Sequence, residues 1–316
     1  MIKQVLAAPA ARQTRRAVTA ARSLLDGMSL WMLDVGAADG APVRWQPYRQ
    51  LIEYIAVEPD PRSSSELESL SNDGYRSRRV ITQGLWSTAG SLDLHLCRKP
   101  MASSVYQPNM AFAALFPDAS RFDVIGREAM RTTTVDDVVQ SDKIRLDAMK
   151  LDIQGAEFEV LRGASGSLSS VLLVESEVEF APLYVGQPLV DSVTKELGDH
   201  GIEFVDYLFL YRWHPDELDG TGQLVFADAL YMRAPESLVG ADSEVQRKFA
   251  ALAVIYGRGE MLSRLARVVG NEALKRRVQD AAALVNRATR ATHAALQLSA
   301  RLLRMRNNNA RAHLFQ

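Results

Sequence analysis

An apolar run that leads into two glycines, residues 30–40, constrains the fold of this chain more than any other stretch. It reads Leu-Trp-Met-Leu-Asp-Val-Gly-Ala-Ala-Asp-Gly. The apolar residues before Asp34 predict a buried parallel strand, and Gly36 and Gly40 predict a tight turn behind it. In an open α/β sheet the ligand crevice lies beyond the carboxyl ends of the strands. The stretch therefore predicts a ligand site at this turn.

The spacing of the turn favours one kind of ligand over another. It is Asp-x-Gly-x-x-x-Gly, which differs from the Gly-x-Gly-x-x-Gly pattern that holds a pyrophosphate. The difference favours S-adenosylmethionine (SAM) over NAD, because the tail of SAM is an amino acid without phosphate. Asp34 would be costly to bury without hydrogen-bond donors. We expect the ammonium group of SAM or the backbone amides of the turn to supply them.

A second acid follows at the distance expected for a nucleoside site. Residues 54–58 read as another buried strand, which Pro59 ends, and Glu58 lies 22 residues after Gly36. Doubly wound nucleoside sites place an acid there, and its carboxylate accepts hydrogen bonds from the ribose hydroxyls. We therefore predict that Glu58 binds a ribose. The alternative is a strand-end acid that faces water.

Strand and helix patterns alternate over residues 29–236. The predicted strands cover residues 30–35, 54–58, 79–85, 148–153, 171–174, 203–210 and 224–232. This alternation predicts an α/β fold with a doubly wound sheet, mostly parallel, with an antiparallel edge formed by the last two strands. Residues 91–96 read as a hairpin-like extension of that sheet, and residues 99–131 read as mostly irregular.

Both ends of the chain read as helical. Residues 1–28 predict one helix, over about residues 12–25, and residues 237–316 read as helix only. Predicted helices cover residues 243–256 and 260–269, and a long run follows from Asn271, its cap, to about Arg306. Residues 236–316 hold 14 Lys and Arg against 6 Asp and Glu. We expect this basic region to dock a partner protein, the membrane surface or a second copy of the chain.

Charge, cysteine content and hydropathy exclude several classes of protein. The net charge of −1 argues against bulk binding of nucleic acid. The single cysteine, Cys97, cannot form an internal disulfide and fits a reducing compartment. No run approaches the roughly 18 uninterrupted apolar residues that a membrane-spanning helix needs. We therefore expect a soluble, cytoplasmic protein.

Two acids near the ends of the central strands are candidates for chemistry. Asp152 emerges from an apolar strand beside the predicted crevice, just before Gly155. It could act as a general base toward a hydroxyl, hold the charged tail of the cofactor, or bind a metal. Glu175, expected at the tip of the adjacent strand, would complete part of an oxygen-rich Mg²⁺ site. Two carboxylates do not define such a site, so no metal ligand is assigned.

A longer motif around Asp152 is similar to that of a known protein family. Residues 149–164 read Met-Lys-Leu-Asp-Ile-Gln-Gly-Ala-Glu-Phe-Glu-Val-Leu-Arg-Gly-Ala, and Thr-Val-Asp-Asp stands upstream at residues 134–137. Together they resemble the FkbM family of SAM-dependent methyltransferases, to which residues 103–109 and 175–187 are also similar. The resemblance covers about residues 30–235. It implies the class I methyltransferase (Rossmann-like) fold and O-methylation of a sugar, glycan or polyketide-like metabolite.

The resemblance also implies roles for particular residues. The cofactor would be bound by Asp34, Gly36, Gly40 and Glu58, to which we add Ala37 of the turn and Ser104 of the loop at residues 103–109. Asp152 and Glu175 would lie beside the transferred methyl. Independently of the resemblance, Ser103, Tyr106 and Tyr184 are candidates for the acceptor mouth, because they lie on loops expected at the carboxyl edge of the sheet; each could equally serve packing. Two alternatives stay open: an NAD-type oxidoreductase, for which the turn lacks the phosphate-binding glycines, and a catalytically silent docking module.

Overall fold

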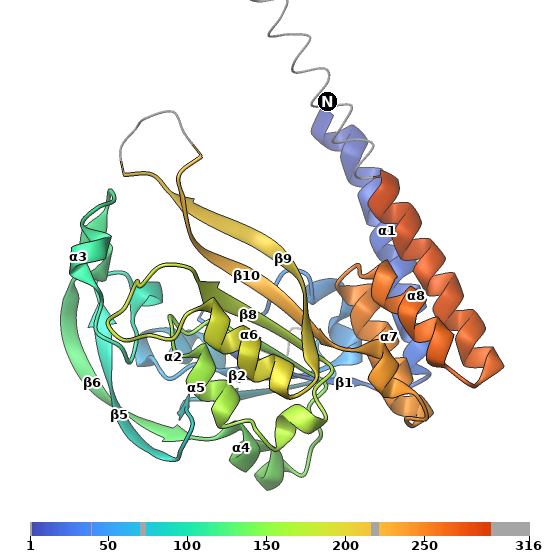
Figure 1. Cartoon of the computed structure of the whole chain (residues 1–316), viewed down its shortest axis with the longest axis horizontal. Coiled ribbons are helices and arrows are strands. Elements are labelled where there is room, and N and C mark those ends of the chain that lie inside the picture. Colours follow the sequence, from blue (N-terminus) through green and yellow to red (C-terminus); the bar gives the residue numbers. More distant parts are fainter. Residues whose placement is uncertain (1, 39, 70–73, 216–220, 292–316) are drawn as a thin grey trace, which may run out of the picture. The chain divides into compact units, whose positions relative to one another are not determined.

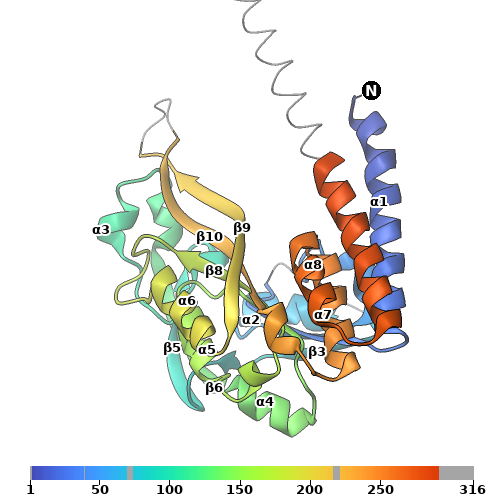
Figure 2. The ribbon, with the colours of Figure 1, turned by 45° about the vertical axis from the view of Figure 1, so that its right-hand side comes forward.

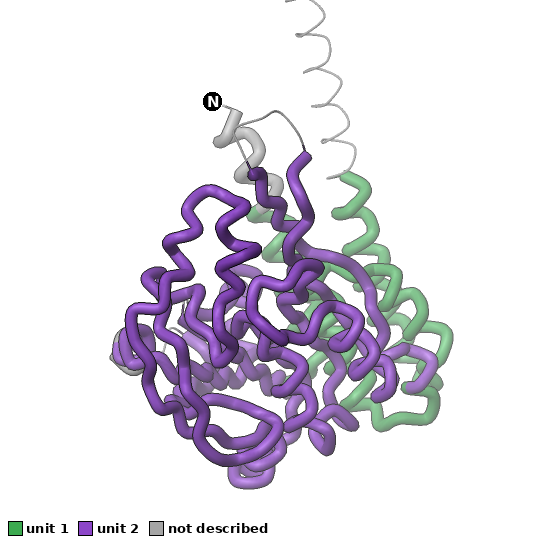
Figure 3. The backbone as a smooth tube through the Cα atoms, turned by 60° about the vertical axis from the view of Figure 1, so that its left-hand side comes forward, with its two compact units in different colours: residues 1–27, 238–316 green, residues 28–237 purple. Residues whose placement is uncertain are grey.

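The computed structural model describes residues 2–38, 40–69, 74–215 and 221–291 (Figure 1). The chain forms two compact units, drawn in different colours in Figure 3. Residues 1–27 and 238–316 form unit 1, and residues 28–237 form unit 2. The sequence suggested three segments, 1–28, 29–236 and 237–316. In the structure the N-terminal segment and the C-terminal segment belong to the same unit.

Unit 2 is built on a seven-stranded sheet in the order β3-β2-β1-β7-β8-β10-β9. Its strands are β1 (Leu30–Val35), β2 (Ile52–Val57), β3 (Ser77–Ile81), β7 (Ala148–Leu151), β8 (Leu173–Glu179), β9 (Ile202–Trp213) and β10 (Gln223–Arg233). The first five strands of that order are parallel, and β10 runs antiparallel to both of its neighbours. Figure 2 shows the long β9–β10 pair from a second direction. The predicted mostly parallel sheet with an antiparallel edge is confirmed.

Short helices flank this sheet. They are α2 (Pro61–Ser69), α4 (Val135–Asp142), α5 (Glu157–Arg162) and α6 (Val190–Asp199), whereas the short α3 (Met110–Ala113) packs in a separate cluster with Cys97 and Phe122. Turns of 3-10 helix lie at Gln46–Leu51, Pro100–Ala102, Ala119–Phe122, Ser167–Ser169 and Pro235–Leu238. Buried aliphatic residues of α4, α5 and α6 pack with those of the central strands into one core. A capping box fixes the start of α4, because Thr134 accepts the Asp137 amide and Asp137 accepts the Thr134 amide.

A second, three-stranded sheet corrects two expectations. It has the order β4-β6-β5, from β4 (Gly84–Leu85), β5 (Gly90–Cys97) and β6 (Val124–Thr133). Residues 91–96 therefore do not extend the main sheet, and residues 124–131, within the stretch expected to be mostly irregular, belong to a strand. Most side chains of β6 are exposed. Its sequence consequently lacks the apolar alternation from which a half-buried strand is recognised.

Strand β8 is longer than predicted, and this changes where its acids lie. The sequence suggested a strand over residues 171–174 that ends in an acidic cluster. In the structure all seven residues of Leu173–Glu179 are buried strand residues. Successive side chains of a strand point to opposite faces. Glu175, Glu177 and Glu179 therefore share one face of the sheet, whereas Val174 and Val178 enter the core on the other.

Unit 1 consists of helices. They are α1 (Ile2–Leu25), α7 (Ser243–Ile255), α8 (Gly259–Val268) and a helix over residues 272–291. The predicted cap is present, since Asn271 Oδ1 accepts the Leu274 amide at 2.9 Å. Among the described residues no helix is both long and apolar enough to cross a bilayer. The part of the predicted long helix beyond residue 291 lies outside the described residues, and the docking role of this region stays a prediction.

Arginines line a surface groove within unit 1. Its walls include Arg12, Arg15 and Arg16 of α1 together with Arg277 of the last described helix. Arg277 also donates to the Ser23 carbonyl at 3.2 Å. The basic character predicted for the C-terminal region therefore extends onto the N-terminal helix.

A glycine in the turn after β1 makes an especially close approach to another loop. Gly36 has a φ of +83°, and a Cβ built there would lie 1.9 Å from the Asp152 carbonyl oxygen. Gly186 has a similar φ, +78°, with nothing within 4 Å of its added Cβ. Gly186→Ala should therefore lower the free energy of unfolding only by the cost of a left-handed backbone conformation, about 1–2 kcal/mol. Gly36→Ala should lower the free energy of unfolding by about 1–3 kcal/mol more, because of overpacking.

Urea unfolding of both variants beside the wild type measures these differences. Equal losses in the two variants would mean that the approach of residue 36 to the Asp152 carbonyl is not a tight contact in the folded protein.

Candidate functional site

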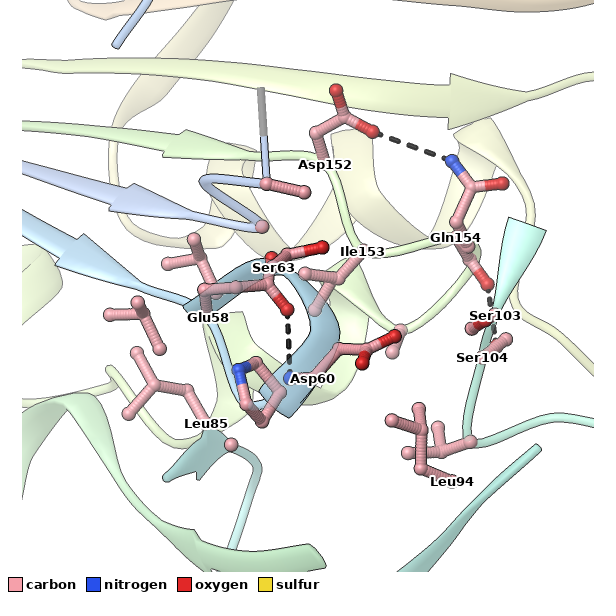
Figure 4. Close-up of a pocket in the computed structure, with 18 of the residues that line it drawn as sticks. Glu58, Asp60, Ser63, Leu85, Leu94, Ser103, Ser104, Asp152, Ile153 and Gln154 are labelled. Atoms are coloured by element: carbon pink, nitrogen blue, oxygen red, sulfur yellow. Dashed lines mark hydrogen bonds between the residues drawn. The ribbon is translucent and has the colours of Figure 1, made fainter. Parts of the chain in front are cut away.

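A cavity lies at the carboxyl ends of β1, β2 and β7, and Figure 4 shows part of its lining. The turn after β1 contributes Gly36, Ala38 and Gly40 to it. Glu58, directly after β2, and Asp152, directly after β7, also line the cavity. Apolar side chains complete the wall, among them Leu85, Trp86, Leu94, Met101 and Met130. The cavity therefore combines acids at the strand ends with an apolar surface.

The turn after β1 is held by backbone hydrogen bonds. The amides of Gly36 and Ala37 both donate to the Val57 carbonyl, at 3.0 and 3.1 Å, and the Gly40 amide donates to the Ala37 carbonyl at 2.8 Å. Gly36 and Gly40 line the cavity, whereas Ala37 is only 1% exposed and does not. Of the three turn residues predicted to bind the cofactor, two are thus placed to reach a ligand.

Glu58 is held in place by its own loop. Its Oε1 accepts the Asp60 amide at 2.9 Å, and burial raises the pKa of the side chain to about 7. Asp60, which the sequence analysis did not single out, pairs with Arg62, whose guanidinium also donates to Ser103 Oγ at 3.0 Å. The Glu58 carboxylate therefore meets the cavity in a fixed position, and burial disfavours its charged form.

Asp34 lies beneath the cavity and does not line it. It is fully buried, and its partners among the described residues are two side chains that we did not predict. Tyr54 donates to Asp34 Oδ2 at 2.8 Å, and the Lys150 ammonium lies 3.7 Å from Asp34 Oδ1. Burial raises the pKa of Asp34 to about 6, although Lys150 and Tyr54 lower it. The sequence could not show these partners because both come from neighbouring strands.

Asp152 lines the cavity beside two nitrogen donors. Lys150 Nζ lies 3.1 Å from Asp152 Oδ2. Gln154 Nε2 donates to Asp152 Oδ1 at 3.4 Å, as Figure 4 shows. Burial disfavours the charge on Lys150, but Asp34 and Asp152 raise its pKa above the ordinary value. Lys150 is therefore a cation that joins the two aspartates, and the sequence analysis did not assign it a role.

Gln154, which was also not predicted as a site residue, forms several hydrogen bonds around the cavity. Its side chain donates to Glu177 Oε1 at 3.0 Å and accepts from the Tyr184 hydroxyl at 2.8 Å. Its backbone carbonyl accepts the Ser104 hydroxyl at 2.8 Å. It has a left-handed backbone, with a φ of +61°, directly before Gly155. The signal for this residue in the sequence was a polar side chain next to a glycine at the end of a strand.

The residues predicted around the loop at 103–109 have different environments. Ser103 and Ser104 line the cavity, as Figure 4 shows, but the hydroxyl of Ser104 is used by Gln154. Tyr106 is half-buried outside the lining. Tyr184 is fully buried, so its expected position at an open acceptor mouth is wrong. The carbonyl of Pro182, to which no role was assigned, accepts a hydrogen bond from Asn109 Nδ2 and helps to hold the same loop.

Glu175 does not lie at a strand tip. It is the third residue of β8 and pairs in register with Lys150 of β7. Its carboxylate forms an ion pair with Arg44 at 3.2 Å and does not line the cavity. The expected Mg²⁺ pair of Asp152 and Glu175 at two adjacent strand tips is therefore wrong in its geometry, because β8 continues for four residues past Glu175.

Comparison with protein families identifies the class. The order of the main sheet, five parallel strands followed by an antiparallel pair, is that of the class I methyltransferase fold. A model described as "Methyltransferase FkbM domain" matches residues 34–204 of the 316. The chain therefore belongs to the FkbM family and is a SAM-dependent methyltransferase. This assignment decides against the NAD-type oxidoreductase.

Individual relatives are more distant. The 2-O-methyltransferase NoeI of Sinorhizobium fredii is 26% identical over 175 residues, which cover 52% of this chain and 70% of that protein. A precorrin-6y C5,15-methyltransferase of Geobacter metallireducens is 10% identical, with a TM-score of 0.34 over 68% of this chain and 87% of that one. The 16S rRNA (adenine(1408)-N(1))-methyltransferase of Catenulisporales acidiphilia is 12% identical, with a TM-score of 0.33 over 68% and 91%.

The buried position of Tyr184 leads to a test of its role. Tyr184→Phe removes a buried hydroxyl that can donate to Gln154 Oε1 at 2.8 Å or to the Ala102 carbonyl at 3.0 Å, and it should lower the free energy of unfolding by about 1–3 kcal/mol, because these acceptors lose their donor. Tyr106→Phe is the matched control, since the Tyr106 hydroxyl makes no hydrogen bond with a described residue. Urea unfolding compares the two. A Tyr184 variant as stable as the Tyr106 variant would show that this hydroxyl contributes nothing.

Proposed function

We propose that this protein is an O-methyltransferase that transfers the methyl of SAM to a hydroxyl of a sugar, a glycan or a polyketide-like metabolite. The observation that carries the proposal is that Asp152 lines the same cavity as Glu58 and the glycine turn. A nucleoside held by Glu58 and a carboxylate able to take a proton would thus share one space. The 2-O-methyltransferase activity in the name of the NoeI relative supports an oxygen acceptor.

In the proposed complex the sugar of SAM lies at Glu58 and its tail lies along the glycine turn. Glu58 offers a desolvated carboxylate whose donors in the structure are backbone amides, so two ribose hydroxyls would add the hydrogen bonds that it lacks. Gly36 and Gly40 leave room for the tail, because neither carries a side chain into the cavity. Leu85, Leu94 and the other apolar lining residues offer a surface for the purine. Asp34, Ala37 and Ser104 would act by holding the backbone around the cavity in position.

The chemistry assigned to the chain itself is alignment and proton removal. When bound, SAM supplies an electrophilic methyl group on its sulfonium. Asp152 would accept the proton of the acceptor hydroxyl, whose oxygen then forms the new bond to carbon by in-line displacement. Lys150 Nζ, 3.1 Å from Asp152 Oδ2, would keep this carboxylate paired at the edge of the cavity. Gln154 would hold the carboxylate in its orientation.

Glu58→Gln tests the cofactor site. Hydroxyl donors favour the ionised form, so binding should lower the raised pKa of about 7. In the wild type the affinity for S-adenosylhomocysteine should therefore fall as the pH drops from about 8 to 6, by at most about tenfold per pH unit. The variant should bind about 10- to 100-fold more weakly at pH 8, because a charged hydrogen-bond acceptor is lost, and its affinity should not follow this pH dependence.

Calorimetric titration at three pH values measures both effects, and Asp93→Asn, on the exposed side of β5, is the control. Wild-type affinity in the Glu58 variant would contradict the ribose role.

Asp152→Asn tests the base. We expect kcat to fall by about 10²- to 10⁴-fold, while the affinity for S-adenosylhomocysteine stays within about threefold, because the predicted ribose contacts are elsewhere. The assay follows radiolabelled methyl from SAM into cell-envelope glycans and, in parallel, into hydroxylated polyketides. Glu159→Gln, on α5 and outside the cavity lining, is the matched control.

An Asp152 variant with the wild-type kcat would rule out this base. Cofactor binding without labelled product from any acceptor would favour the catalytically silent module instead.

A further inference from the structure

We propose that Glu157, Glu177 and Glu179 bind one divalent metal ion beside the loop that carries Asp152. One carboxylate oxygen from each of the three side chains lies within 4.8 Å of the other two. Glu157 begins α5, whereas the other two glutamates are alternate residues of β8. Strand and helix thus bring together three hard oxygen ligands that are distant in the sequence.

Burial distinguishes this cluster from an ordinary group of surface acids. The side chains of Glu157, Glu177 and Glu179 are in residues that are 1%, 7% and 2% exposed. In the part of the chain that the structure describes, no lysine or arginine forms an ion pair with any of them. Three ionised carboxylates this close in a poorly solvated place repel one another strongly. A cation or shared protons must therefore compensate them.

The hydrogen bonds of the cluster leave a buried oxygen that points to a ligand. Glu157 Oε1 accepts the Ile153 amide at 2.7 Å, and Glu177 Oε1 accepts Gln154 Nε2 at 3.0 Å. These bonds orient both carboxylates, and the amides of Gly155 and of Glu157 itself also stabilise the charged form of Glu157. The Gln187 side chain lies close enough to Glu179 to lower the pKa of its carboxyl, but Glu179 Oε1 itself is buried and forms no hydrogen bond with a described residue. A buried carboxylate oxygen that lacks a donor, within a cluster of carboxylates, is what a cation site requires.

The ligand set selects the kind of metal. Three carboxylates without histidine or cysteine suit hard cations such as Mg²⁺, Mn²⁺ and Ca²⁺, with waters as the remaining ligands. Oxygens at about 2.1–2.5 Å from such an ion can be up to about 4–5 Å apart. The spacing of these three oxygens falls within that span. One divalent ion would neutralise most of the charge of the three ionised carboxylates.

The position of the site indicates what the ion would do. Its ligand Glu157 closes the turn at residues 153–157 through the Ile153 amide, and its ligand Glu177 holds Gln154, which contacts Asp152. An ion there would fix the backbone of the loop and would not touch the reacting atoms. Its role is structural, so the inference does not rest on the proposed methyl transfer.

Direct binding of Mn²⁺ to the chelator-treated full-length protein tests the proposal without SAM. At pH 8, where the glutamates are more readily ionised, paramagnetic resonance should show one tight Mn²⁺ per chain that Mg²⁺ displaces, and the melting temperature should rise on metal addition. Glu179→Gln should weaken Mn²⁺ binding by at least about tenfold, or 1.4 kcal/mol. Glu128→Gln, an exposed acid of β6, is the control and should bind as the wild type does.

The competing explanation is that the three carboxylates share protons, and burial does raise the pKa of each of them. In that case the wild type shows no saturable Mn²⁺ binding at pH 8, and Glu179→Gln stabilises the metal-free protein without affecting metal titration. Either result overturns the proposal. If Glu179→Gln does not fold, the Glu157→Gln variant replaces it, and the stoichiometry on the wild type decides the question by itself.

Discussion

The close approach of two loops, one after β1 and one after β7, determines how the site is built. Backbone at Gly36 lies so near the Asp152 carbonyl that no side chain fits between them. The Asp152 amide donates to the Val35 carbonyl at 3.0 Å and ties the loops together at that point. Because adjacent parallel strands β1 and β7 end side by side, the glycine turn and the acid after β7 open onto one cavity. The position of Asp152 is thus fixed by backbone geometry.

Charge then follows strand register across the sheet. Asp34 of β1 is paired with Lys150 of β7, which is paired with Glu175 of β8. Residues paired in register point to the same face, so these three side chains form an alternating row, which Arg44 continues by its ion pair with Glu175. Each buried carboxylate in the row has a cation beside it. The arrangement explains how the sheet can hold acids at its centre without solvent.

Sequence patterns predicted the sheet well and the site only in part. The glycine turn, Glu58 and Asp152 all follow buried strands, so local pattern alone placed them at the cavity. Asp34 and Glu175 were predicted to contact the ligand, but in the structure they pair with other side chains. These partners, Tyr54, Lys150 and Arg44, come from neighbouring strands and from a distant loop. No local pattern shows such pairing. Strand β6 was missed for a related reason, since its exposed residues give no hydrophobic alternation.

The acids of unit 2 around the cavity fall into two groups according to what neutralises them. Asp34, Asp60 and Asp152 each have a lysine or arginine within 4 Å, although burial still raises the pKa of Asp34 to about 6.

Glu58 and the cluster of Glu157, Glu177 and Glu179 form no ion pair with a lysine or arginine among the described residues, and burial raises the pKa of each. A ligand stabilises such groups most, because a hydrogen-bond donor or a cation offsets the cost of burying an unpaired carboxylate. Glu58 faces the cavity, where hydroxyl groups can reach it. The other three glutamates are buried together, and an ion that carries its own charge would compensate them there.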